Sequence, residues 1–428
     1  MAFAHVIIDG CGLTSIRQVY GGGNAASAPS TQVDINGTYE IEEVFGGGNG
    51  KDKITKDGGL TYIDNPGANV GYYEYDDNDP DAATQVLREE NFAYGSGRAN
   101  MLIHGGRIHR VYGGSNTKGN VRKVALTLLE DETGCPFKVD EAYGGGKSAL
   151  MDGRAVLEMA CIPGLKNAYG GAEAANINND VELNITNGHF NRVFGGNNIS
   201  GSITGTITIN VEETGCHLLT IGQLYGGGNQ APYVAQEGEH GPTLNVHSFT
   251  SIGDIFGGGY GKTAVVTGDT YVNVNVCNGN TFPESEGWDA TKLATEEAET
   301  AAYTGNKTFT FVEYQRTSNG GFVIDEDTGE RLKDNRTVEV YLPPFTHGKI
   351  GAINNIYGGG NEAPVVGNTH VFIGTKEGDD ISFETPTNAP LTKTVVGADI
   401  RGNVFGGGNN ADVTGNTNIV IGKSTTIP

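Results

Sequence analysis

Short segments in which apolar and polar residues alternate recur along the chain. Residues 181–188 (VELNITNG), 207–215 (ITINVEETG) and 271–279 (YVNVNVCNG) each place apolar side chains at every second position and end near a glycine. A period of two is that of a β-strand with one buried face. Each segment is followed by a turn, a second short segment and a glycine run, so the pattern predicts units of two strands.

The second segment of each unit ends in an aliphatic residue, an aromatic residue and then glycine. The motif occurs eleven times, with its aromatic residue at Tyr20, Phe45, Tyr94, Tyr112, Tyr143, Tyr169, Phe194, Tyr225, Phe256, Tyr357 and Phe405. Uninterrupted copies lie 18 to 31 residues apart, a spacing that suits one coil of a β-solenoid better than the longer blade of a propeller. We therefore expect an all-β fold, a parallel β-helix over residues 1–428 with about eleven coils. At about 4.8 Å per coil the rod would be roughly 50 Å long.

Two further residue types keep the same register. An asparagine follows the aromatic residue by four positions in seven copies, at Asn24, Asn49, Asn116, Asn198, Asn229, Asn361 and Asn409. Side-chain amides at equivalent positions of stacked coils can bond to each other, which predicts a structural asparagine ladder. Four cysteines precede an aromatic residue by eight or nine positions, at Cys11, Cys135, Cys161 and Cys216. We expect these to be small buried packing residues at one position of the coil, with a bond between Cys135 and Cys161 as the alternative.

Three stretches break the spacing and are expected to project from the solenoid: residues 51–92, 278–347 and 374–396. The longest predicts a small subdomain, with a helix over 289–302 and a hairpin from the segments KTFTFVEYQ and RTVEVYL. It contains Trp288, Tyr303 and Tyr314. These aromatic side chains are the candidate carbohydrate-binding residues, although packing of the insertion against the coil is the favoured use of them.

Composition and charge narrow the classes of function. Glycine accounts for 68 of 428 residues, and the formal net charge of −23 makes nucleic acid an unfavourable partner. No window of eighteen apolar residues is present, so we expect no transmembrane helix, and the first twenty residues show no secretory signal. Neither end carries a recognisable cap, from which we expect the chain to be an excerpt of a longer secreted protein.

Motifs that would carry catalysis or bind a cofactor are weak. GGGYGKT (257–263) lacks the first glycine of a phosphate-binding loop, because Phe256 stands there. We therefore expect no cofactor, with calcium at the acidic segment 73–81 as the one alternative. Candidates for polysaccharide cleavage are Asp399 with Arg401, and a second group consisting of His104, His109 and Arg110. Their offsets from the motif favour exposed strand positions instead.

Runs such as VYGGSNTKGNV (111–121), ELNITNGHFNRVFGGNN (182–198) and VTGNTNIVIG (413–422) resemble the repeat-rich surface proteins of bacteria. In overall plan the chain is similar to right-handed parallel β-helices of the pectate-lyase and autotransporter-adhesin type. The resemblance implies a right-handed solenoid in an extracellular or cell-surface setting, with a polysaccharide or a host or cell-surface protein as partner. We expect a structural and adhesive rod, with a polysaccharide lyase or glycoside hydrolase as the alternative.

Overall fold

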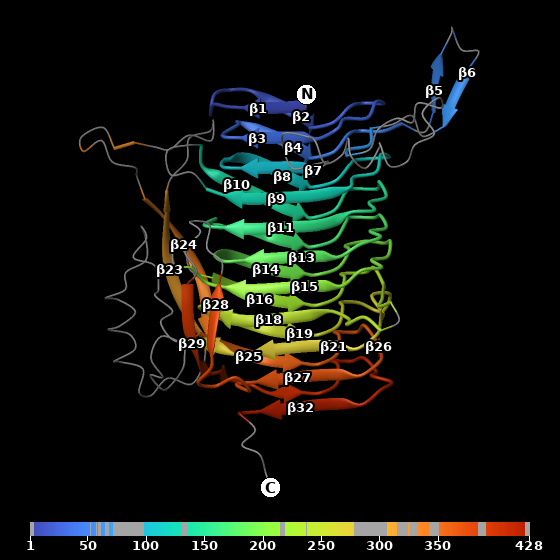
Figure 1. Cartoon of the computed structure of the whole chain (residues 1–428). Helices are drawn as coiled ribbons and strands as arrows, with labels where there is room; N and C mark the ends of the chain where they lie inside the picture. Colours follow the sequence, from blue (N-terminus) through green and yellow to red (C-terminus); the bar gives the residue numbers. More distant parts are fainter. Residues whose placement is uncertain are drawn as a thin grey trace.

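The fold is built from two large parallel sheets that run the length of the molecule (Figure 1). The computed structural model describes residues 4–51, 53–56, 58, 61–64, 68–71, 98–130, 135–214, 219–236, 238–277, 306–314, 324, 325, 328, 333–341, 351–383 and 391–423. Within these residues the regular elements are all strands, and each turn of the chain adds one strand to each sheet. This confirms the predicted all-β parallel solenoid.

We call the sheet formed by the first strand of each coil sheet A. Its strands, in spatial order, are β1 (Ala4–Ile8), β3 (Thr31–Ile35), β7 (Arg98–Ile103), β9 (Lys123–Leu129), β11 (Arg154–Ala160), β13 (Val181–Ile185), β15 (Ile207–Glu212), β18 (Thr243–Ser248), β21 (Thr270–Val274), β27 (Thr369–Ile373) and β32 (Thr417–Ile421).

The second strand of each coil belongs to sheet B. Its strands are β2 (Ser15–Tyr20), β4 (Glu40–Phe45), β8 (Gly106–Tyr112), β10 (Phe137–Tyr143), β12 (Gly164–Tyr169), β14 (Gly188–Phe194), β16 (Leu219–Tyr225), β19 (Ser251–Phe256), β25 (Ala352–Tyr357), β30 (Asp399–Ile400) and β31 (Val404–Phe405). The last two strands both pair with β25 and belong to one coil.

A third, shorter line of pairing closes the remaining side of the coils. It includes the three-stranded sheet of β17 (Tyr233–Val234), β20 (Val266–Thr267) and β26 (Val365–Val366). Further bridges join Val70 to Ala28 and Val121. Val70 is fully buried although it falls inside the predicted insertion 51–92, so that stretch projects only in part and then returns to the core.

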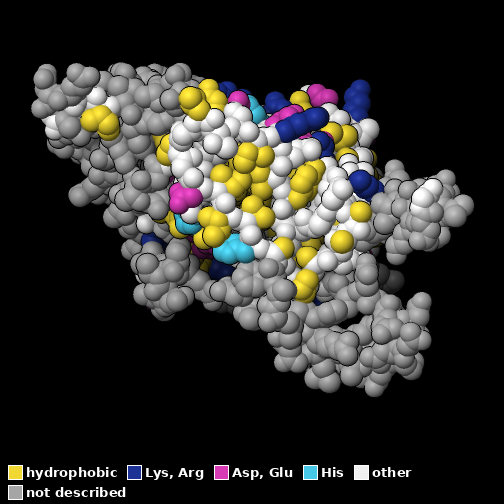
Figure 2. Space-filling view, turned by 90° about the horizontal axis from the view of Figure 1, so that it is seen from above, with side chains coloured by type: hydrophobic (Ala, Val, Ile, Leu, Met, Phe, Trp, Pro, Cys, Tyr) yellow, Lys and Arg dark blue, Asp and Glu magenta, His cyan; other side chains and the backbone are white. Residues whose placement is uncertain are grey.

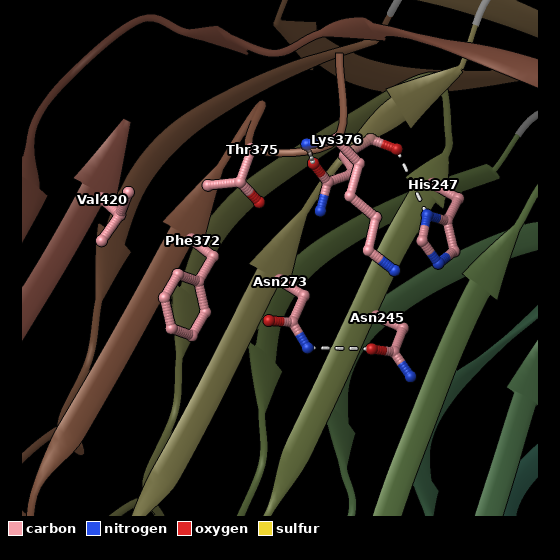
Figure 3. A pocket seen from close by; sticks show the side chains of 8 residues that line it. Asn245, His247, Asn273, Phe372, Thr375, Lys376 and Val420 are labelled. Atoms are coloured by element: carbon pink, nitrogen blue, oxygen red, sulfur yellow. Dashed lines mark hydrogen bonds between the residues drawn. The ribbon is translucent and has the colours of Figure 1, made fainter. Parts of the chain in front are cut away.

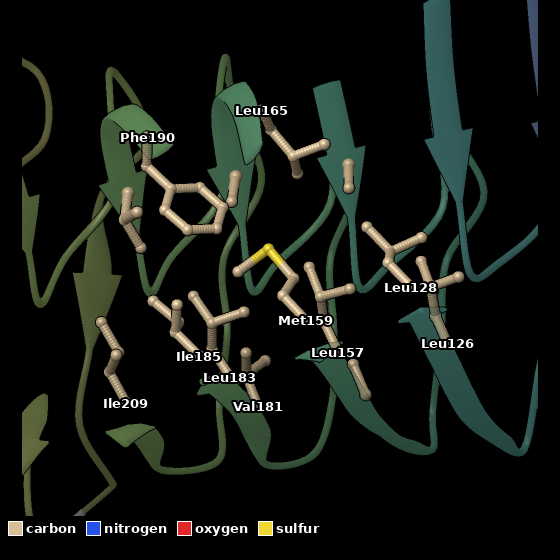
Figure 4. Close-up of a cluster of buried hydrophobic side chains, with 14 of the residues drawn as sticks. Leu126, Leu128, Leu157, Met159, Leu165, Val181, Leu183, Ile185, Phe190 and Ile209 are labelled. Atoms are coloured by element: carbon tan, nitrogen blue, oxygen red, sulfur yellow. The ribbon is translucent and has the colours of Figure 1, made fainter. Parts of the chain in front are cut away.

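The core lies between the sheets and consists of columns of like residues. Inward positions of sheet A stack in register, as in Leu126, Leu157, Leu183 and Ile209 (Figure 4). Their side chains are essentially inaccessible to solvent. Because each strand alternates inward and outward residues, the period-two pattern places one apolar residue of every pair into this core. Burial of aliphatic side chains contributes about 1.5–3 kcal/mol each, and is the main stabilisation of the rod.

The motif aromatics form one continuous stack beside the core. Neighbouring ring centroids lie 4.6 to 5.2 Å apart, in the order Tyr20, Phe45, Tyr112, Tyr143, Tyr169, Phe194, Tyr225, Phe256, Tyr357 and Phe405. This confirms that the copies sit directly above one another. Tyr94 lies outside the described residues, and β4 pairs directly with β8, which leaves no coil between Phe45 and Tyr112 for an eleventh copy.

Close approach of the coils explains the glycine that follows each aromatic residue. The Gly21 N–H donates to the carbonyl of Phe45, and a Cβ added at Gly21 would lie 2.4 Å from the Gly46 oxygen. The same holds for Gly144, where the Gly170 oxygen would be 2.2 Å away. Neither glycine has a positive φ. The motif glycines are thus required because a side chain would push the next coil away, rather than for a left-handed turn.

The three predicted insertions appear as antiparallel additions to the solenoid (Figure 1). The first contains β5 (Lys53–Lys56) paired with β6 (Thr61–Asp64), and the second contains β23 (Asn306–Tyr314) paired with β24 (Lys333–Tyr341). The predicted helix over 289–302 lies outside the described residues. In the third insertion, β28 (Asp380–Phe383) pairs with β29 (Leu391–Gly397), which also pairs with β22 (Val276–Cys277). This last hairpin lies beside the C-terminal end of β18, where Phe383 contacts the ring of His247.

Apolar side chains lie at the centre of the N-terminal end face, and charged ones gather toward its rim (Figure 2). Val6, Ile8 and Ile16 of the first coil pack on the core but remain partly accessible. At the opposite end Phe405 is 42% exposed and Tyr357 is partly buried, whereas the rings from Phe45 to Phe256 are nearly inaccessible. The stack is therefore buried everywhere except at its ends.

Candidate functional site

The side chains of the three aromatic residues predicted to bind carbohydrate lie outside the described part of the structure. Trp288 and Tyr303 lie outside the described residues, and Tyr314 is placed only as the last residue of β23, opposite Lys333. The acidic segment 73–81 also lies outside them. These assignments therefore remain predictions, and the candidate site described below lies on the solenoid itself.

The predicted asparagine ladder is present in three separate runs. Its amides bond at 2.8 Å between Asn49 and Asn24 and at 3.0 Å between Asn116 and Asn49. The other two runs join Asn229 to Asn198 at 2.8 Å and Asn409 to Asn361 at 3.1 Å. The gaps fall at the copies whose equivalent residues are Lys147, Glu173 and Tyr260.

A buried ion cluster fills the first gap in this ladder. Glu43 is only 2% exposed, and its carboxylate accepts hydrogen bonds from Lys147 Nζ at 2.6 Å and Gln18 Nε2 at 2.8 Å. Arg110 adds an ion pair at 3.1 Å. Burial alone would raise the pKa of Glu43, but Lys147, Gln18 and Arg110 together hold it below the usual value of a glutamate. Because every charge is paired, this cluster is structural.

Ion pairs hold Asp399, Arg401 and His109, although Arg401 Nε is buried without a hydrogen-bond partner within the described part of the chain. Asp399 and Arg401 pair with each other at 2.7 Å. His109 lies between Asp140 at 2.8 Å and Glu40 at 3.1 Å. The His109 contacts join strands of neighbouring coils, as expected for outward-facing sheet residues, whereas Asp399 and Arg401 belong to one coil.

The cysteines depart from the predicted packing role. Cys11 and Cys135 form a disulfide with a Cα–Cα distance of 5.4 Å, across 124 residues of sequence. Both residues lie in the turn between a sheet A strand and a sheet B strand, but two coils separate their own coils. Cys161 is also disulfide-bonded, while Cys216 lies outside the described residues. Cys277 is a buried free thiol.

A second asparagine ladder, which the sequence analysis missed, crosses the outer face of sheet A. The amides of Asn184, Asn210, Asn245 and Asn273 bond in series at 2.8 to 3.0 Å. They occupy one register column, and the next two positions of that column are Phe372 and Val420. The amide row therefore stops at an apolar patch, and the carbonyl oxygen of Asn273 has no donor from the following coil.

A shallow pocket of about 570 Å³ lies at this junction (Figure 3). Its lining consists of Asn245, His247, Asn273, Asn275, Phe372, Thr375, Lys376 and Val420. Strands β18, β21, β27 and β32 supply its floor, and the start of the β28–β29 hairpin segment supplies Thr375 and Lys376. Thr375 and Lys376 directly follow β27, and they meet residues of β18 and β21 because these three strands are neighbours in the stack.

Hydrogen bonds fix the polar wall of the pocket. His247 Nδ1 lies 3.2 Å from the carbonyl oxygen of Asn275, and the Lys376 N–H donates to Asn275 Oδ1 at 2.9 Å. Burial and the nearby Lys376 charge lower the pKa of His247, with the Asn275 carbonyl acting in the opposite direction. A neutral His247 that donates through Nδ1 leaves Nε2 as an acceptor.

The Lys376 ammonium is the single cationic group of the pocket lining, and no carboxylate is in that lining. Its side chain is exposed and extends toward Asn245 and His247 (Figure 3). Within the described part of the chain no ion pair involves Lys376. Among the acidic residues of the adjoining hairpin, Asp379 is paired with Lys423 at 2.7 Å. The pocket lining itself therefore carries one positive charge, on a protein that is acidic as a whole.

Aromatic rings continue the surface beside the pocket. Tyr271 and His370 stack with centroids 4.7 Å apart, and His370 lies 6.2 Å from Phe372. The three side chains are half-buried, so each presents one side to solvent. His370 Nε2 is held by Asp269 at 3.3 Å. The result is a row of rings next to a row of amides on one flat sheet.

A buried acidic pair lies at the hairpin edge next to this pocket. Burial raises the pKa of Glu213 to about 8 and that of Glu212 to about 7, opposed in both cases by the charge of Lys393. Thr250 Oγ1 donates to the Glu213 carboxyl group at 3.2 Å. Burial likewise raises the pKa of the Cys277 thiol to about 11. A thiol with a raised pKa is a poor nucleophile at neutral pH, which favours a structural role for this group.

No protein-family model, curated protein or solved structure matches the chain. Among the described residues no helix is long and apolar enough to cross a membrane, and in that same part of the chain no three acidic, histidine or cysteine side chains are grouped to hold a metal ion. The arrangement on sheet A, with rings, amides and one cation but no paired carboxylates, is suited to binding.

Proposed function

We propose that the chain is an extracellular structural and adhesive part of a bacterial surface protein, and that it binds glycan or protein ligands while holding them on a stiff rod. The observation that carries this proposal is the stack of ten rings from Tyr20 to Phe405, which runs without a break through coils interrupted by long insertions. A rod that keeps its register across such insertions can display them without losing rigidity.

The disulfide supports the extracellular setting. A bond such as Cys11–Cys135 persists in oxidising compartments and is rare in the cytosol. It ties the first coil to the fourth, which would protect the end of the rod from fraying. The bonded state of Cys161 adds to this support.

The adhesive part of the proposal is supported by the surface rather than by the core. Insertions leave the solenoid at defined coils, and per-repeat insertions commonly mark the binding side of a repeat protein. The sheet A pocket adds a concave site between such an insertion and the flat sheet. Both features offer contact area without altering the coil.

The test is to express the full chain with its disulfides intact and to screen it on arrays of neutral and anionic glycans and of surface proteins. The same samples are assayed for new reducing ends and unsaturated sugars. We expect saturable binding without turnover, and alkylation of the protein on intact cells should show oxidised cysteines in the exported fraction. Glycan cleavage, or an absence of binding to glycans and proteins alike, would overturn the proposal.

A further inference from the structure

We infer that the sheet A pocket binds a short saccharide carrying one anionic group, a carboxylate or a sulfate, held by Lys376 and packed against Phe372. The inference rests on the proposed adhesive function and names the class of ligand and its site. It concerns the solenoid wall, and so differs from the predicted platform of Trp288, Tyr303 and Tyr314.

Polar atoms of the pocket that have no partner within the described part of the chain are the first support. The Asn273 carbonyl ends an amide row because Phe372 follows it. The Lys376 ammonium has no ionic partner within the described part of the chain, and His247 uses its Nδ1 on Asn275. A sugar offers hydroxyl groups that both donate and accept, and can therefore satisfy the carbonyl and the imidazole Nε2 together.

The apolar side of the pocket fits the C–H face of a sugar ring. Phe372 is half-buried, and the neighbouring Val420 side chain is 38% exposed. They are adjacent in the same outward column, so together they form a flat apolar surface about one ring wide. Ligand pockets typically combine such a surface with a few polar groups that fix orientation.

Charge selects an anionic but short ligand. Lys376 is the one charged residue that lines the pocket, and a charge-assisted hydrogen bond to an anion is about twice as strong as a neutral one. The chain as a whole carries −23, which repels a long polyanion more than a ligand with a single charge. We therefore expect preference for one charged sugar within a short oligosaccharide.

The experiment measures affinities of the full chain for three trisaccharides by titration calorimetry: one with a terminal uronate, one with a single sulfate, and their neutral counterpart. The variants are Lys376→Gln and Phe372→Ala. Leu102→Ala is the matched apolar control, because Leu102 occupies the same outward column near the opposite end of the rod. Lys138→Gln, on the exposed side of β10, controls for the lost charge.

We expect Lys376→Gln to weaken binding of at least one charged trisaccharide by roughly tenfold or more, and to leave the neutral one within about twofold. Phe372→Ala should weaken all three by roughly tenfold, while both controls stay within about twofold of the parent protein. The charged trisaccharide that binds more tightly identifies the preferred anionic group as a carboxylate or a sulfate. Lys376 is exposed, so its substitution leaves the fold intact, which circular dichroism would verify.

Unchanged affinity in both variants would overturn the inference and leave the adhesive function standing, with the ligand bound elsewhere. Tighter binding of the neutral trisaccharide than of either charged one would overturn the assigned ligand class. A parent chain that binds proteins but none of the glycans would also overturn the assigned ligand class. The proposed function itself falls if the parent chain cleaves glycans, or if it binds neither glycans nor proteins.

Discussion

The ring stack makes a quantitative prediction, because its members differ in burial but not in chemistry. Phe194 is 1% exposed and stacks on Tyr169 at 5.2 Å and on Tyr225 at 4.8 Å. Phe405 is 42% exposed and stacks on one ring, Tyr357, at 4.9 Å. Replacing each with alanine compares an internal rung with a terminal one.

The expected cost follows from burial and stacking. Phenylalanine to alanine in a core costs about 3–5 kcal/mol, and each aromatic pair contributes about 0.5–1.5 kcal/mol beyond its buried area. Phe194→Ala removes a fully buried ring with two partners, so we expect about 4 kcal/mol. Phe405→Ala removes a ring that is about half exposed and has one partner, so we expect about 1–2 kcal/mol.

Urea unfolding followed by circular dichroism measures the difference, and hydrogen exchange locates it. A solenoid can open coil by coil, so exchange should increase in β12, β14 and β16 for Phe194→Ala and remain near the parent value there for Phe405→Ala. Equal destabilisation by the two substitutions, or a cost below about 1.5 kcal/mol for Phe194→Ala, would refute the view that the stack supports the rod.

Two further predictions concern pH and redox state. The pKa of Glu213 is raised to about 8, so the native state keeps a proton that the unfolded chain loses near pH 4.5. Stability should therefore fall as pH rises from about 5 to 8, by up to about 1.4 kcal/mol per pH unit. Glu213→Gln should reduce this slope in melting temperatures recorded at pH 5 and pH 8, and an unchanged slope would contradict the assignment. Joint replacement of Cys11 and Cys135 by serine should cost about 2–5 kcal/mol and expose β1 to proteolysis, while a reductant should no longer alter the cleavage of this region. Proteolysis equal to that of the oxidised parent would count against a stabilising bond.

The ring stack and the first asparagine ladder were predicted because they depend on register, which a repeat displays directly in the sequence. Equivalent residues such as Asn24 and Asn49 meet because their coils are adjacent, whatever the length of chain that joins the two coils. The Tyr94 copy was wrongly counted as a coil, although Ser96 replaces its second glycine. That substitution is physically informative, since the glycines are needed where coils approach each other closely.

Contacts between residues that are distant in sequence and outside the repeat register were not predictable. The partner of Cys11 could not be read from spacing, because cysteine connectivity depends on how loops cross coils. The sheet A pocket likewise requires Lys376 from an insertion to meet strands distant in sequence. One sign was visible, however: the strands around Asn184, Asn210 and Asn245 each carry asparagine at the same alternating position.

Exact register between coils has a consequence for how such a molecule can change in length. Val124 pairs with Ala155, and Ala155 pairs with Val181. Excision of residues 155–180 would bring Val124 opposite Val181 and Tyr143 onto Phe194, with like side chains again in contact. Whole units can thus be gained or lost by recombination without shifting the register of the remaining coils, so the reach of the rod can evolve in discrete steps of about 4.8 Å.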